Sequence, residues 1–378
     1  MTKQTNSEVD FSFVGNLSKL AEDYNAIDLS GNYSSFPFPE IIEEKILAYF
    51  KSVTGYSPSE GALQLRTVLS EYIGKKYFRT YCPMNEITIT AGATQAIFTA
   101  IASTVKEGDE AIILEPSYES LSTSIEMCGA RPIFIKIKDS ENLIDWNEVQ
   151  KAITTRTKLI IVSTPHNILG RVFTADDMEN LQKLINGTKI RVISDESLSE
   201  IVYSDSLAAS ATFYPKLADN CYIVGSLSQS LGVPGWKIGY CLAPKALMEK
   251  FRKVQRAVVN SVNHPIQLAM ADYIARNSSL FPNMVLLERN RNAFLQILKD
   301  SKFKILPNAG GYYQMLNYSS ISNLKDIEFA ETLIKEQQIA TTPLSIFYHD
   351  KTCKQQIRVN LAANYDDIVE AANRLAKL

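Results

Sequence analysis

The sequence is poor in the residues that build metal centres and disulfide frameworks. Histidine occurs only at positions 166, 264 and 349, and no HExxH pattern or similar cluster is present. The five cysteines are scattered, without the CxxC spacing of zinc or redox sites. We therefore expect no metal site, and the odd, dispersed set of cysteines is typical of reduced thiols in a cytoplasmic protein.

The sequence also lacks a surplus of either charge and any long apolar run. Lysine and arginine number 39 against 41 acidic residues, so no basic excess indicates a nucleic acid or an anionic membrane as partner. The longest apolar runs, such as Ala111–Leu114, have the length of strands and are far too short to cross a bilayer. The N-terminal stretch MTKQTNSEVDF lacks the apolar core of a secretory signal, and no G-x-S-x-G motif of serine hydrolases occurs.

What the sequence does contain is an alternation of short apolar runs with helical stretches, which is typical of a mainly parallel sheet. The expected strands are apolar nearly throughout, as strands buried on both faces are: Glu86–Thr90, Glu110–Leu114, Pro132–Ile137, Leu159–Ser163, Arg191–Ser194 and Tyr222–Gly225. Lys237–Leu242 follows too closely for a helical crossover, so we expect this strand to be antiparallel to its predecessor. The expected helices are Ala93–Val105, Tyr118–Met127, Ala175–Ile185, Pro244–Asn260, Pro282–Asp300 and 365–377.

A chain of 378 residues exceeds the usual size of a single core, so two domains are expected. The alternation of apolar runs and helical stretches ends near Asn277, where a long amphipathic helix begins and a small mixed segment follows. We therefore expect a large α/β domain over residues 36–275, and a smaller α+β domain from residues 276–378 with the arm 1–35.

Polar and small residues follow two of the expected strands, at the edge where open α/β sheets bind ligands. Gly92, Ala93 and Thr94 begin a helix, where backbone N–H groups can approach a phosphate; a tight turn with a helix cap is the alternative. Asp195 ends a buried strand, where a carboxylate is costly unless it has a partner. It could keep a pyridinium N–H cationic, or simply cap the next turn.

A third stretch, GSLSQSLGVPGWKIGY, places Ser226 and Ser228 on a strand and returns Lys237 on the next strand. Two hydroxyls and a cation that converge on one loop suit a phosphate dianion. Taken alone, each of these residues would more often be a polar side chain on the surface without a ligand.

In this order, the three stretches resemble the class I/II aminotransferases, which depend on pyridoxal 5'-phosphate (PLP) and have fold type I. The resemblance covers nearly the whole chain, and GWK (235–237), NLSKLAEDYNAIDLS and SVNHPIQLA are most similar to the kynurenine and methionine aminotransferase branch. It implies a mainly parallel mixed sheet with helices on both faces, plus a smaller α+β domain. It also implies a homodimer that acts on a small amino acid and a keto acid.

The resemblance also implies roles for individual residues. The cofactor phosphate would be held by Gly92, Ala93, Thr94, Ser226, Ser228 and Lys237, with Tyr56 from the partner subunit. Tyr118 would stack on the pyridine ring, Asn167 would bind the phenolic oxygen and Asp195 the ring nitrogen. Gly31 would lie in the substrate loop, and Arg358 would clamp the substrate carboxylate. The planar fork of arginine suits bidentate carboxylate binding.

The pattern breaks at Gln229, which stands where the family's S-x-S-K motif carries its Schiff-base lysine. A carboxamide is neither a nucleophilic amine nor a base, so PLP would be bound noncovalently. D-E-x-Y has also become D-E-S-L, with Leu198 in place of the tyrosine, and N-P-T-G has become N-I-L-G through Ile168 and Leu169. Three changes around one cofactor edge indicate natural divergence more than one engineered substitution, while slow residual transamination and an unrecognised base stay open.

Two functions follow from this interpretation. The first is a transaminase of aromatic or sulfur amino acids whose activity is weakened or altered. The second is a non-catalytic protein that binds a pyridoxal species or an amino acid. An enzyme of another class without PLP would leave Asp195 and Arg358 unexplained.

Overall fold

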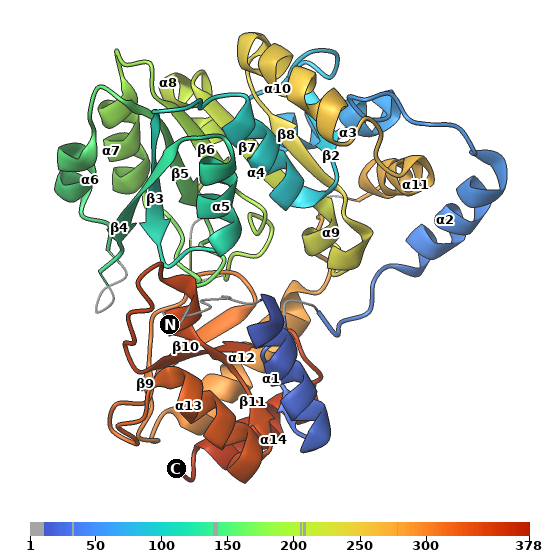
Figure 1. The fold of residues 1–378 in the computed structure, drawn as a ribbon. Helices are drawn as coiled ribbons and strands as arrows, with labels where there is room; N and C mark the ends of the chain where they lie inside the picture. Colours follow the sequence, from blue (N-terminus) through green and yellow to red (C-terminus); the bar gives the residue numbers. More distant parts are fainter. Residues whose placement is uncertain (1–10, 32–33, 139–142, 205, 207–208, 278) are drawn as a thin grey trace, which may run out of the picture. The chain divides into compact units, whose positions relative to one another are not determined.

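A computed structural model describes residues 11–31, 34–138, 143–204, 206, 209–277 and 279–378 (Figure 1). The chain divides into two compact units. The larger unit comprises Phe36–Leu286 and Pro307–Tyr312. The smaller unit comprises Met1–Ser35, Leu287–Leu306 and Tyr313–Leu378.

The larger unit is built on a seven-stranded sheet in the order β2-β8-β7-β6-β5-β3-β4. Its strands are β2 (Ile87–Thr90), β3 (Glu110–Glu115), β4 (Arg131–Lys136), β5 (Thr157–Ser163), β6 (Arg191–Asp195), β7 (Cys221–Ser226) and β8 (Gly239–Leu242). β2, β3, β5, β6, β7 and β8 are almost entirely buried, as their apolar sequences predict. The mainly parallel mixed sheet is therefore confirmed.

The antiparallel direction of the strand after β7 is also confirmed, because β8 pairs antiparallel with both β7 and β2. Its expected start is wrong. Lys237 precedes β8 and has a left-handed backbone (φ 55°), because it ends the 3₁₀ turn η2 (Pro234–Trp236). Ser228 also lies outside the strand, in the short helix α9 (Leu227–Ser230), because the chain turns as soon as β7 ends.

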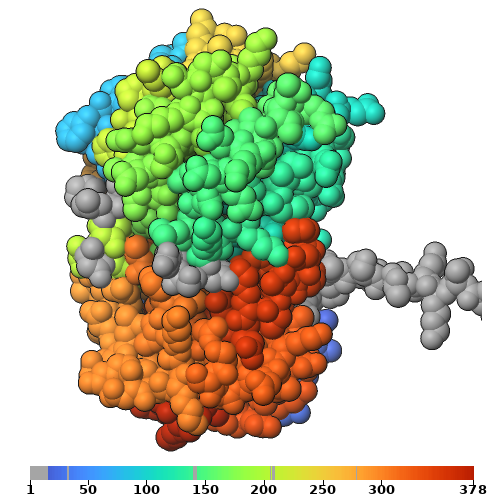
Figure 2. Space-filling model, turned by 90° about the vertical axis from the view of Figure 1, so that its left-hand side faces the viewer, coloured from blue at the N-terminus to red at the C-terminus, as the bar shows by residue number. Residues whose placement is uncertain are grey.

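Helices cover the sheet and bury its apolar side chains. α4 (Gly92–Ala102), α5 (Glu119–Met127) and α10 (Lys245–Val258) share one hydrophobic core with the strands. α6 (Trp146–Ala152), α7 (Ala175–Ile185), α8 (Pro215–Ala218) and the turn η1 (Ala211–Phe213) pack with one another and against β4 and β7. Figure 2 shows the side of this unit on which α6 and α7 lie.

Three further helices extend the larger unit beyond β2. α3 (Leu63–Tyr77) packs against β2 and against α11 (His264–Ile274), and α11 packs in turn against α2 (Glu40–Ser52). Figure 1 shows α2 beyond α11, at the outer margin of this unit. Several large apolar side chains of α2 stay exposed, including Leu47 (59 %) and Phe50 (52 %).

The smaller unit combines helices with two small sheets. β12 (Thr342–Pro343), β13 (Gln356–Asn360), β10 (Tyr313–Asn317) and β9 (Lys304–Ile305) form an antiparallel sheet in that order, and β1 (Ile27–Asp28) pairs with β11 (Ile339–Ala340). The helices are α1 (Phe11–Asp23), α12 (Met284–Leu298), α13 (Asp326–Thr332), the π-turn η3 (Leu333–Gln337), the 3₁₀ turn η4 (Leu344–Phe347) and α14 (Tyr365–Leu375).

Candidate functional site

The start of α4 lies at the carboxyl edge of the sheet, directly after β2, and has no side-chain cap. Its N-cap residue, Ala91, makes no side-chain capping hydrogen bond, so the first N–H groups of α4 do not have this common partner. The helix dipole adds a partial positive charge at this end. The structure therefore places Gly92, Ala93 and Thr94 in an arrangement that suits an anion.

Lys237 approaches the start of α4 directly. A Cβ atom added at Gly92 would lie 3.0 Å from both Cε and Nζ of Lys237, and Gly92 itself has φ +76°. The backbone conformation therefore favours glycine here, and a larger residue would also have to push aside the end of the Lys237 side chain. Within the described part of the chain, the ammonium of Lys237 forms no ion pair, so a cation and uncapped N–H groups share one place.

Gly239 makes this close approach possible. It pairs with Thr90 on one side and with Ser226 on the other. A Cβ atom at Gly239 would lie 2.6 Å from the carbonyl carbon of Gly92 and 2.8 Å from the nitrogen of Ala93. Any larger residue would therefore displace the start of α4.

The two serines of the third stretch hold the loop together. The hydroxyl of Ser226 accepts a hydrogen bond from the N–H of Gln229 at 3.2 Å, and that of Ser228 accepts from the N–H of Ile238 at 2.8 Å. Both side chains are buried. Each hydroxyl still has a proton to donate, so the role of these serines as phosphate ligands stays a prediction.

Gln229 is half-buried in α9, and its backbone is fully engaged. Its carbonyl accepts a hydrogen bond from the hydroxyl of Tyr312 at 2.6 Å, while its N–H bonds to Ser226. Its carboxamide makes no hydrogen bond to the described residues. That Gln229 replaces the family's lysine stays a prediction.

Asp195 ends β6 and is only 8 % exposed. Its Oδ1 atom accepts hydrogen bonds from the N–H of Ser197, at 3.1 Å, and from the Ser197 hydroxyl. Burial raises the pKa of Asp195, and the two bonds from Ser197 oppose that rise. Asp195 therefore has two local hydrogen bonds and a second carboxylate oxygen for a ligand.

Asn167 lies in a loop that His166 fixes. The imidazole Nδ1 of His166 accepts hydrogen bonds from the N–H groups of Ile168, at 3.2 Å, and Leu169, at 3.3 Å, and the ring also bonds the Pro116 carbonyl. Burial lowers the pKa of His166 to about 3, so the ring is neutral near pH 7. The amide oxygen of Asn167 is buried without a hydrogen-bond partner among the described residues.

Two predicted aromatic contacts differ in their surroundings. Tyr118 is half-buried and directly precedes α5, two residues after Pro116. Tyr56 is 88 % exposed. The stacking of Tyr118 and the reach of Tyr56 to a partner subunit both stay predictions.

Gly31 and Arg358 belong to the smaller unit, where β13 holds both. The amide of Asn360 donates to the carbonyl of Gly31 at 2.9 Å, and Arg358 lies two residues earlier on the same strand. The guanidinium of Arg358 lies 4.0 Å from the ring centre of Tyr313 and 4.9 Å from that of Phe347. These rings hold the cation in place by cation–π attraction.

The residues present fit a PLP-like molecule in its phosphate and its ring. The uncapped start of α4 and the ammonium of Lys237 suit the phosphate. The buried carboxylate of Asp195 can accept a hydrogen bond from a ring N–H, and the amide N–H group of Asn167 can donate to a phenolic oxygen. No lysine takes the place of Gln229 in α9.

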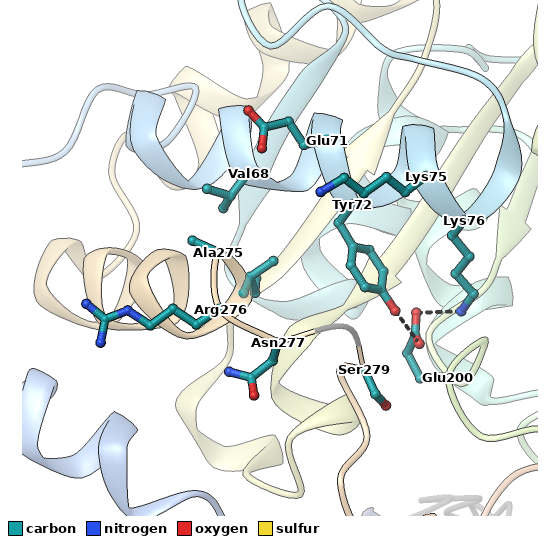
Figure 3. A pocket seen from close by; sticks show the side chains of 11 residues that line it. Val68, Glu71, Tyr72, Lys75, Lys76, Glu200, Ala275, Arg276, Asn277 and Ser279 are labelled. Atoms are coloured by element: carbon teal, nitrogen blue, oxygen red, sulfur yellow. Dashed lines mark hydrogen bonds and ion pairs between the residues drawn. The ribbon is translucent and has the colours of Figure 1, made fainter.

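A separate surface pocket of about 560 Å³ lies between α3, the end of α11 and Glu200 (Figure 3). Figure 3 shows Tyr72 and Lys76 converging on Glu200, whose carboxylate accepts a hydrogen bond at 2.7 Å and forms an ion pair at 2.8 Å. None of the residues predicted for the site lines this pocket.

Sequence reasoning missed several residues that build the site. Ser197 carried a signal, since an Asp-x-Ser sequence after a strand is typical of a side-chain turn. Gly239 and Tyr312 carried none, because their importance depends on contacts with segments distant in the chain. Among the described residues no cluster of three potential metal ligands occurs, and no helix is both long and apolar enough to cross a membrane.

Comparisons with known proteins agree with this architecture. Residues 25–375 match the model of the family "Aminotransferase class I and II". The chain is 32 % identical to methionine aminotransferase of Escherichia coli over 96 % of this chain and 94 % of that protein, and 27 % identical to kynurenine–oxoglutarate transaminase 1 of Mus musculus over 90 % and 89 %.

Solved structures show the same similarity. The crystal structure of YbdL from Escherichia coli, for which a methionine aminotransferase function is described, has a TM-score of 0.95, 31 % identity and full coverage of both chains. N-Succinyldiaminopimelate aminotransferase from Mycobacterium tuberculosis, at 22 % identity, shares the fold with a TM-score of 0.91 over 96 % of each chain. The chain therefore belongs to the class I and II aminotransferases, a PLP-dependent family of fold type I.

Proposed function

We propose that this aminotransferase-family protein binds PLP without a covalent bond and descends from transaminases of sulfur or aromatic amino acids. The observation that carries the proposal has two features. The ammonium of Lys237 lies beside the uncapped start of α4, and Gln229 stands in the same loop as Lys237. The first feature supports retention of a phosphate site. The second supports loss of the covalent anchor and of its base.

Each residue contributes one recognisable task. Lys237 and the first N–H groups of α4 bind the phosphate, Asp195 accepts from the ring nitrogen, and Asn167 contacts the phenolic oxygen. Arg358, in contact with two aromatic rings, binds the carboxylate of an amino or keto acid. When bound, PLP supplies an electron sink for negative charge at the substrate α-carbon.

The activity expected from this site is weak. A positioned acid or base contributes roughly 10²–10⁴ in rate, and the carboxamide of Gln229 can perform neither task. The similarity to methionine aminotransferase and kynurenine–oxoglutarate transaminase supports a sulfur or aromatic amino acid as the ancestral donor. We place this reaction in the cytoplasm.

We also propose that the chain forms a homodimer in which Tyr56 completes the phosphate site of the partner. Its side chain is 88 % exposed, which leaves it available to a second copy.

A second candidate function is a non-catalytic protein that binds a pyridoxal species or an amino acid. The residues that would bind a ligand are present, while the residue that would perform proton transfer is the one exchanged. This combination favours binding without turnover.

One experiment separates the two functions. The protein is incubated with PLP and a panel of amino acids, and both the absorption spectrum and the formation of keto acids are measured. Measurable turnover would exclude the pure binding function. A change in the PLP spectrum without keto acid would support it.

Matched variants test the site itself. Gln229→Lys should give a borohydride-reducible covalent adduct with PLP at residue 229, whereas Gln229→Arg, which adds a charge but no reactive amine, should not. Lys237→Gln should weaken PLP binding by roughly 10–100-fold, since a hydrogen bond to a charged group is lost. Lys253→Gln, on the exposed face of α10, should leave it unchanged. If Gln229→Lys formed no adduct, the alignment of this loop with the family motif would be wrong.

A further inference from the structure

Ser197 is the residue that controls the buried carboxylate at the end of β6. Asp195 has no cationic partner within the described part of the chain, and burial raises its pKa. A buried carboxylate without a cation keeps its charge only through hydrogen bonds from neutral donors. Both donors that oppose the effect of burial come from Ser197.

The two bonds from Ser197 have different origins. The N–H bond to Oδ1 of Asp195 follows from the backbone turn, so any residue except proline at position 197 would make it. The hydroxyl bond to the same oxygen depends on the side chain, and Ser197 is only 3 % exposed. The family pattern D-E-x-Y leaves this position open, so the resemblance assigns it no role.

We propose that Ser197 is a positioning residue that keeps Asp195 ionised and fixes which oxygen is offered to a ligand. Because Oδ1 already accepts two hydrogen bonds, Oδ2 is the atom left for a pyridinium N–H. This inference rests on the proposed function for its ligand. The effect of Ser197 on the charge of Asp195 does not depend on any ligand.

The neighbouring carboxylate of Glu196 does not take part in the hydrogen bonds that hold Asp195. Glu196 follows Asp195 but turns to other partners, since its Oε1 accepts from the Ser194 hydroxyl at 2.9 Å and from the N–H of Ala211 at 2.8 Å. Ser194 and Ser197 thus each donate a hydroxyl to a different buried carboxylate. The pair forms a natural matched control.

The test measures Asp195 directly in the full chain without added PLP. Aspartate and glutamate side chains are labelled with ¹³C, and Asp195→Asn and Glu196→Gln assign the two signals. Ser197→Ala should move the titration midpoint of Asp195 to higher pH, because one donor to the charged form is lost. Ser194→Ala should leave that midpoint in place and change the titration of Glu196 instead.

Binding of PLP provides a second measurement. The dissociation constant of Ser197→Ala should rise about tenfold or more, while that of Ser194→Ala should stay within roughly threefold of wild type. If Ser197→Ala did not fold, Ser197→Thr and Ser197→Val would replace it, because they differ mainly in the hydroxyl. The threonine variant should behave as wild type and the valine variant should not.

The outcomes distinguish this inference from the proposed function. An unchanged Asp195 midpoint in a folded Ser197→Ala or Ser197→Val variant overturns the role of Ser197, whatever the protein binds. A wild-type chain that fails to bind PLP overturns the proposed function, while the titration still decides whether Ser197 holds Asp195 ionised.

Discussion

Glu196 is a buried acid that directly follows the end of β6, and its surroundings shift its pKa into the neutral range. Burial raises the pKa of Glu196 from 4.5 to about 7, although hydrogen bonds from Ser210, Ala211 and Ser194 oppose the rise. Between pH 4.5 and about pH 7, Glu196 is therefore protonated in the folded state and ionised in the unfolded state. The corresponding stability is fully present below about pH 4.5 and is lost as the pH rises through about 7.

We expect Glu196→Gln to remove this loss, because a carboxamide resembles the protonated acid. The free energy of unfolding of the variant, relative to wild type, should rise by roughly 2–3 kcal/mol between pH 5 and pH 8. Urea unfolding at both pH values measures it. Glu126→Gln, at an exposed position of α5, serves as control, and an equal pH dependence in wild type and Glu196→Gln would contradict the assignment.

At the scale of single residues, the sequence predicts identities better than contacts. That Asp195 ends a buried strand follows from the apolar run before it. That Ser197 binds it, or that Tyr312 bonds the backbone of Gln229, requires three-dimensional proximity. The expected start of the strand β8 at Lys237 is wrong because Lys237 ends the turn η2 with a left-handed backbone and the strand begins only at Gly239.

At the scale of elements, α7 begins in a buried charge network. The side chain of Asp177 accepts hydrogen bonds from Thr174 in a capping box, from Trp146 Nε1 at 2.9 Å and from Arg171 Nη2 at 2.6 Å. Burial alone would raise the pKa of Asp177, but these partners hold it below the usual range. The stability they confer is present above that range and is lost as the pH falls through the lowered pKa.

We expect Asp177→Asn to destabilise the protein by about 3–5 kcal/mol at neutral pH, because it removes the carboxylate charge that pairs with the buried guanidinium of Arg171. Thermal or urea unfolding measures the loss. Glu179→Gln, which removes an exposed pair with Lys183 on the same helix, should cost under about 0.5 kcal/mol. Similar costs for both variants would show that burial does not decide the strength of these pairs.

The elements themselves were largely predictable. α7 spans Ala175–Ile185 as expected, since Thr174 and Asp177 signal its start and its apolar residues recur at helical spacing. The sheet order β2-β8-β7-β6-β5-β3-β4 was not, because strands of similar apolar character do not reveal which neighbour each will pair with.

At the scale of the whole molecule, α2 carries a group of exposed apolar side chains that suits a partner. Ile41, Leu47 and Phe50 are exposed there, and Tyr56 follows shortly after the helix. Leu47→Glu combined with Phe50→Glu should convert a dimer to single chains, which light scattering coupled to size exclusion measures. Met127→Glu, at an equally exposed apolar residue of α5, should leave the mass unchanged. A wild-type chain that elutes with the mass of one copy would contradict the dimer.

The family was readable from the order of motifs along the chain, since each motif alone was ambiguous. Whether the chain still transaminates does not follow from these motifs, because the family resemblance describes chains that carry a lysine where this one has Gln229.

The backbone bonds of Gln229 separate architecture from reactivity at that position. Its N–H and carbonyl hold α9 to Ser226 and Tyr312, and these bonds are the same for almost any side chain. Evolution can thus exchange the reactive group without rebuilding the loop, and the exchange is reversible. Under the proposed function, the loop that holds glutamine at position 229 could therefore hold a lysine with the same backbone bonds.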